Sequence, residues 1–117
     1  MHTNFLARMN NERIQQLIRF VQEEPNEPFN LYALAMEYIS SQPAQARLYF
    51  DQLLAEHPDY LPTYYHAAAL YAERDERERA AELYDKGIRL AKAQQNQKTF
   101  LELERAQQAF EDDEDDW

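Results

Sequence analysis

The 117-residue sequence contains no cysteine and only one glycine, Gly87. A chain without cysteine cannot form disulfides, use a thiol nucleophile or bind a metal through thiolates. One glycine is too few for the turns of a β-rich fold or for a phosphate-binding loop. Alanine, leucine, glutamate, glutamine and arginine dominate, and all of these favour helix. We therefore predict an all-α chain, folded as a single domain on the basis of its length.

Long apolar runs are also missing. No stretch approaches the roughly 18 uninterrupted apolar residues of a membrane span. The N-terminal sequence MHTNFLARMNNERIQQ lacks the apolar segment of a secretory signal. These absences predict a cytoplasmic protein that does not bind a membrane.

The charge is strongly acidic but unevenly distributed. The formal net charge is −10, and six of the negative charges fall in the run from Glu111 to Asp116. Because no basic residues cluster elsewhere, binding to nucleic acid is disfavoured. Consecutive carboxylates repel one another, so we expect residues 111–117 to form a disordered tail. Trp117 ends this tail, and the sequence gives it no clear role.

The central part of the chain repeats itself. One series of large, small or apolar, small and large residues recurs 33 positions later, and a second apolar series recurs 34 positions later. The first pairs Leu31, Leu34, Ala35 and Tyr38 with Tyr64, Ala67, Ala68 and Tyr71; the second pairs Ala46, Phe50 and Leu53 with Ala80, Tyr84 and Gly87. Each series marks one face of a helix, so each copy is predicted to be two helices joined by a turn. The turn of the first copy is one residue shorter.

These residues resemble the tetratricopeptide repeat (TPR) family. Its 34-residue motif carries an aromatic residue, Leu, a small residue and Tyr on helix A. Helix B carries Ala, an aromatic residue, Ala and a closing Pro. Pro58 closes the first copy, whereas Lys92 stands at that position in the second. The resemblance implies a right-handed α-α superhelix of five to six antiparallel helices.

The flanking segments complete the predicted organisation. We expect a flexible segment at 1–10, a half repeat at 11–27, repeat one at 28–60, repeat two at 61–94, a capping helix at 98–110 and the acidic tail. The half repeat is similar to a helix B that has no helix A before it. A capping helix needs an apolar stripe on only one side, and Phe100, Leu103, Gln107 and Phe110 follow such a stripe.

No catalytic, cofactor-binding or metal-binding residues are predicted. Ser40 and Ser41 are the only serines, and they lie in a predicted turn without a nearby histidine. His2, His57 and His66 are not spaced three or four residues apart, which a helical metal site would need. We therefore predict a protein that is not an enzyme.

The resemblance implies a partner-binding site on the concave face, formed by helix A residues outside the core. In this sequence the candidates are Tyr32, Met36, Ile39, Tyr65, His66, Ala69 and Glu73, with Ser40 beside them. Such an apolar, tyrosine-rich face is typical of a protein contact. A family variant grips a C-terminal carboxylate with lysine, asparagine and arginine, but Tyr32, Met36 and His66 do not supply that set.

Several interpretations remain open at this stage. The main one is an adaptor that binds a protein or peptide segment through apolar anchors. Alternatives are an acidic-tail chaperone or inhibitor of a basic partner, a structural subunit of a larger complex, and a homodimer that covers the same face. The terminal helices could also cover the face within one chain.

Overall fold

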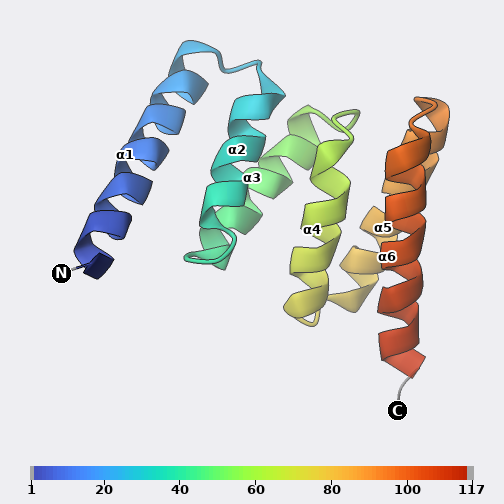
Figure 1. The fold of residues 1–117 in the computed structure, drawn as a ribbon. Coiled ribbons are helices and arrows are strands. Elements are labelled where there is room, and N and C mark those ends of the chain that lie inside the picture. Colours follow the sequence, from blue (N-terminus) through green and yellow to red (C-terminus); the bar gives the residue numbers. More distant parts are fainter. Residues whose placement is uncertain (1, 116–117) are drawn as a thin grey trace. The chain divides into compact units, whose positions relative to one another are not determined.

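The computed structural model describes the backbone of residues 2–115 and the side chains of residues 10–113. The described part of the chain contains six α-helices and no strand (Figure 1). The helices are α1 (His2–Glu23), α2 (Pro28–Tyr38), α3 (Pro43–Glu56), α4 (Pro62–Glu73), α5 (Arg77–Ala93) and α6 (Gln97–Asp115). The prediction of an all-α chain with five or six helices is therefore confirmed.

The helices group into two compact units, Met1–Pro58 and Asp59–Trp117. The sequence analysis expected one domain. In helical repeats each hairpin packs mostly within itself and against its sequence neighbours, so contacts stay local and a short chain can divide between repeats. Each unit is described below by itself.

In the first unit, α2 and α3 form a hairpin and α1 packs on α2. Proline stands in the first turn of both α2 and α3, where its missing N–H costs no helix hydrogen bond. The side chain of Glu27 accepts a hydrogen bond from the backbone N–H of Phe29 at 3.3 Å. The apolar centre of the hairpin is fully buried and consists of Leu31, Leu34, Ala35, Ala46, Phe50 and Leu53.

In the second unit, α4 and α5 form the equivalent hairpin, and α6 packs on α5 and also touches α4. Gly87 on α5 faces Tyr64 of α4. A Cβ atom built on Gly87 would lie 2.7 Å from the Tyr64 Cβ and 3.1 Å from the Leu103 Cδ1. The only glycine of the sequence therefore lies where α4 and α6 leave no room for a side chain on α5.

Both turns of the second unit reverse through a residue with a positive φ. Asp75 has φ 61° between α4 and α5, and Gln95 has φ 59° between α5 and α6. After each of them a backbone N–H reaches back to the preceding helix, from Glu76 to Tyr71 and from Asn96 to Ala91, at 2.9 Å in both cases. This is the usual left-handed ending of an α-helix, which glycine adopts most easily.

Every residue of the two predicted repeat series is buried, and Ala35, Ala68 and Ala80 have no exposed surface. Helices α2 and α3 lie within residues 28–60, and α4 and α5 lie within residues 61–94. The spacing from Tyr38 to Ala46 is one residue shorter than the spacing from Tyr71 to Ala80. In the second copy α4 continues two residues beyond Tyr71, whereas α2 ends at Tyr38, and the turn after α4 contains the left-handed Asp75.

Both ends of the chain differ from the prediction. Helix α1 begins at His2, so residues 2–10, expected to be flexible, are helical. No proline or glycine interrupts residues 2–23, and a helix that has formed propagates easily through such residues. Helix α6 likewise continues past Phe110 to Asp115, so the acidic segment is helical rather than disordered over residues 111–115. Trp117 lies outside the described residues.

Two side-chain contacts support the helical start of the acidic segment. The Nε2 of Gln108 donates a hydrogen bond to the Oδ1 of Asp112 at 2.9 Å. The Nη1 of Arg77 lies 3.8 Å from the Oδ2 of Asp113. These contacts offset the unfavourable placement of carboxylates at the negative end of a helix.

Candidate partner-binding groove

The predicted site residues on α2 follow one side of the helix. Tyr32, Met36 and Ile39 are spaced four and three residues apart, and all three are half-buried; Ser40, just beyond, is exposed. Burial raises the pKa of the Tyr32 hydroxyl. These residues belong to the first unit, and those on α4 belong to the second. A groove shared by both sets stays a prediction.

On α4, Tyr65, Ala69 and Glu73 are four residues apart and lie along one face of the helix. The side chain of Tyr65 is 41 % exposed, which is high for a large ring. His66 packs edge-on against Tyr65, with ring centroids 5.1 Å apart and planes at 71°. Burial lowers the pKa of the His66 imidazole below its ordinary value.

A groove of about 510 Å³ runs along this face of α4. It is lined by Tyr65, Ala69, Ala72 and Glu73 of α4, by Arg77 and Tyr84 of α5, and by Ala106, Ala109, Phe110 and Asp113 of α6. Three of the four residues predicted on α4 therefore line one hollow, while His66 supports Tyr65 from the side. The contributions of α5 and α6 were not predicted as site residues.

The groove is lined by both small and large side chains. Four alanines, two on α4 and two on α6, leave space that longer side chains would fill. Behind them Tyr84 and Phe110 pack together, with ring centroids 5.5 Å apart and planes tilted by 47°. Both rings are almost fully buried, so they give the groove a rigid aromatic wall.

Arg77, the first residue of α5, is held against α6. Its Nη2 donates a hydrogen bond to the backbone carbonyl of Phe110 at 2.8 Å. Its guanidinium carbon lies 4.2 Å from the centroid of the Phe110 ring, a cation–π contact. Together with the approach to Asp113, these contacts hold the side chain of Arg77 in place where it lines the groove.

The pKa of the Tyr84 hydroxyl is affected by its burial and by two other groups that line the groove. Burial raises the pKa of its hydroxyl, and the hydroxyl of Tyr65 and the carboxylate of Glu73 raise it further. Tyr65, Glu73 and Tyr84 all line the groove, so two tyrosines and one carboxylate contribute to its surface.

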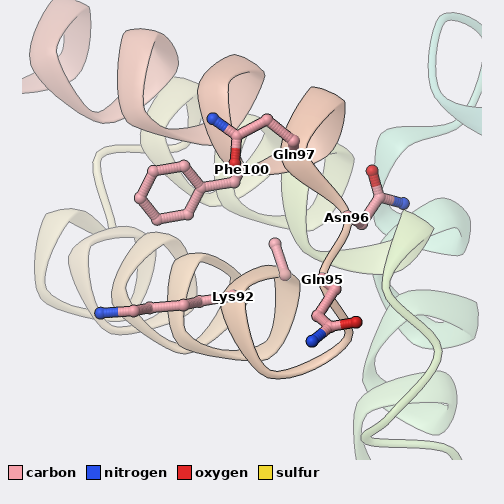
Figure 2. A pocket seen from close by; sticks show the side chains of 6 residues that line it. Lys92, Gln95, Asn96, Gln97 and Phe100 are labelled. Carbon is pink, nitrogen blue, oxygen red and sulfur yellow. The ribbon is translucent and has the colours of Figure 1, made fainter.

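A second, smaller cavity of about 340 Å³ lies at the turn between α5 and α6, lined by Ala91, Lys92, Gln95, Asn96, Gln97 and Phe100 (Figure 2). Phe100 reaches from α6 toward α5 in this view. The Oδ1 of Asn96 accepts a hydrogen bond from the backbone N–H of Thr99 at 3.0 Å and caps α6. The four polar residues that line the cavity are all exposed, so this cavity is a weaker candidate site than the groove.

The described residues show no group of three or more side chains able to hold a metal ion. None of the helices within the described part of the chain combines the length and the hydropathy that crossing a bilayer requires.

Comparisons with known proteins identify the fold. No protein-family model matches the sequence, and no curated protein sequence matches it. Among solved structures, the crystal structure of a tetratricopeptide repeat domain protein from Salinibacter ruber is 36 % identical with a TM-score of 0.70, and the match covers 73 % of this chain and 96 % of that one. A solution NMR structure of such a domain protein from the same organism gives the same identity and TM-score, over 75 % and 90 % of the two chains.

A more distant structure, that of MamA, matches over almost the whole length of the present chain. It is 17 % identical with a TM-score of 0.61, and the match covers 99 % of this chain and 77 % of that one. At this identity the likeness concerns the fold alone. The identity and coverage of the Salinibacter ruber domain, together with the two buried repeat series, show that the chain belongs to the tetratricopeptide repeat family.

Proposed function

We propose that the chain is a non-catalytic adaptor that binds a segment of another protein in the groove formed by α4, α5 and α6. TPR domains are in general protein–protein interaction modules, and the Salinibacter ruber protein is such a domain. The observation that carries the proposal is the groove itself. It combines four alanines, called here the alanine floor, with the buried rings of Tyr84 and Phe110 and the exposed ring of Tyr65. The alanine floor consists of Ala69, Ala72, Ala106 and Ala109.

The dimensions of the groove favour a short segment. Tyr65 and Glu73 are eight residues apart on α4, and a helix rises about 1.5 Å per residue, so the groove extends roughly 12 Å along the helix. Three or four residues of an extended chain, or two turns of a helix, cover that length. Tyr32, Met36 and Ile39 remain the predicted binding residues of the first unit. Apolar anchors on the segment would fill the space above the alanines.

Tyr65→Ala tests the groove because it removes the large exposed ring. Leu101→Ala is the matched control: Leu101 is 40 % exposed, lies in the same unit on α6 and does not line the groove. Proteins crosslinked to each variant in native cells would be captured and quantified against the unchanged chain. We expect Tyr65→Ala to lose its specific partner and Leu101→Ala to keep it. Equal capture by both variants would contradict the groove as the binding site.

The acidic segment offers a second candidate function, which is to bind a basic partner electrostatically as a chaperone or inhibitor. Glu111, Asp112 and Asp113 are all exposed on α6, beside the groove. Truncation after Phe110 removes them and keeps the carbonyl that Arg77 binds. An adaptor would retain its partner after truncation, and its binding would depend weakly on salt. A protein that binds through the acidic segment would lose its partner after truncation, and the untruncated protein would bind far more weakly at high salt.

A further inference from the structure

The groove carries more negative than positive charge. Glu73 and Asp113 line it, and Arg77 is the one cation among its described lining residues. Arg77 is already engaged by the Phe110 carbonyl, the Phe110 ring and Asp113. Glu73 is exposed and forms no ion pair with any residue between 10 and 113. A bound segment therefore meets an uncompensated carboxylate.

The surroundings of Glu73 favour a planar cation. Glu73 is exposed and lines the groove, so both oxygens of its carboxylate are open to a donor that enters the groove. A guanidinium carries five N–H donors in a fixed plane and can serve two acceptors at once, which an ammonium group does less well.

The alanine floor sets a second requirement for a segment that binds in the groove. Ala69 lies one helical turn from Glu73, and Ala72 is its immediate neighbour, so the space above the alanines adjoins the carboxylate. A large aliphatic or aromatic side chain would fill this space and displace water from apolar surface. A segment without such a side chain would leave the hollow empty.

We propose that the groove selects protein segments in which an arginine lies within three or four residues of a large apolar side chain. The arginine pairs with Glu73 and the apolar side chain occupies the alanine floor. This inference rests on the proposed function and specifies the chemistry of the partner. Partners with acidic segments are excluded, because they would meet Glu73 and Asp113 with like charge.

The test uses a phage-displayed library of random peptides of about twelve residues, selected on the full chain. Peptides that also bind the Tyr65→Ala variant are removed. We expect the remaining peptides to be enriched in arginine close to Leu, Ile, Phe or Trp. Selected peptides would then be synthesised with arginine and with its neutral isostere citrulline. Affinities would be measured by fluorescence anisotropy at low salt, where ion pairing is least screened.

We expect citrulline to weaken binding to the unchanged chain about fivefold, which is the upper end of the range for one partly exposed ion pair. The loss should fall below twofold on Glu73→Gln. Glu102→Gln is the matched control, because Glu102 is exposed on α6 and does not line the groove. It should preserve the full effect of citrulline. Because Glu73 is exposed, its neutralisation should leave the melting temperature almost unchanged.

The outcomes separate this inference from the proposed function. Peptides that depend on Tyr65 but lack arginine, or bind citrulline equally well, would overturn the inference and leave the groove as a binding site. A citrulline effect that persists on Glu73→Gln would also overturn it. If the selection gave no peptide that depends on Tyr65, the proposed function would fail together with the inference.

Discussion

The close approach of helices at Gly87 can be tested by adding one methyl group. Gly87→Ala changes a helix-interior residue, and on helix propensity alone alanine would stabilise the protein by about 1 kcal/mol. The new Cβ, however, would lie 2.7 Å from the Tyr64 Cβ, and real Cβ atoms essentially never approach so closely. Because the Tyr64 Cβ is bonded directly to the backbone of α4, rotating a side chain cannot relieve the contact.

The magnitude follows from the two opposing effects. Overpacking of a rigid core typically costs about 1–3 kcal/mol. The upper half of that range applies here because α4 and α5 must separate. Subtracting the propensity gain of about 1 kcal/mol leaves a net loss of about 1–2 kcal/mol in the free energy of unfolding. For a chain of 117 residues this lowers the melting temperature by about 4–8 °C.

Thermal and urea unfolding followed by circular dichroism would measure the effect. The neighbouring exposed residue Lys86 supplies the control, through the pair Lys86→Ala and Lys86→Gly. Both lose the ion pair with Glu82, so their difference reports helix propensity alone, and the alanine variant should be more stable by about 1 kcal/mol. A Gly87→Ala protein that melts higher than the unchanged chain would refute the tight contact between α4 and α5.

Three further changes probe other parts of the structure. Gln95→Gly should raise the free energy of unfolding by about 1 kcal/mol, because Gln95 holds a φ of 59° that glycine adopts without strain; a lower urea midpoint would contradict this. Phe50→Ala, at a fully buried ring, should cost about 3–5 kcal/mol in urea unfolding, and a loss below about 1 kcal/mol would show that the α2–α3 hairpin is loosely packed. Since burial lowers the pKa of His66 in the folded chain, the unfolded chain takes up the proton first as the pH falls through the ordinary value of 6.5. The free energy of unfolding should therefore decrease below about pH 6.5 and recover above it. His66→Gln should reduce this pH dependence in urea titrations between pH 7.5 and 5, and an unchanged pH dependence would argue against a buried imidazole.

The core of each repeat could be read from the sequence because it depends on spacing. The recurrence of Ala35 as Ala68 and of Phe50 as Tyr84 places small and large residues at fixed points of two helices. Close packing allows few other arrangements of such pairs. Helices α2 and α4 begin at Pro28 and Pro62, because the first turn of a helix tolerates proline and its interior does not.

Only the residues that α4 contributes to the groove were predicted from the sequence. Tyr65, Ala69 and Glu73 were identified from the resemblance, which assigns functional positions to helix A. The α6 residues were read only as a capping stripe, and Ala106 and Ala109 lie outside that stripe. A clue was present in the sequence: alanines three residues apart on an amphipathic helix leave one side of it without bulk.

The ends of the chain were mispredicted because composition alone was weighed there. Like charges in a row predicted disorder for residues 111–117. The contact between Arg77 and the end of α6 joins residues more than thirty positions apart and has no local sequence signal. At the other end, the absence of helix breakers before Asn11 favours continuation of the helix.

Under the proposed function, the four alanines of the groove constrain how its binding preference can change. Alanine is already among the smallest side chains, so nearly every substitution at Ala69, Ala72, Ala106 or Ala109 makes the hollow shallower. Mutational drift at these sites would therefore exclude bulky ligands sooner than it would admit larger ones. Under the proposed function, a valine or leucine at Ala109, which is exposed, would leave the fold intact and prevent a bulky side chain from entering the groove.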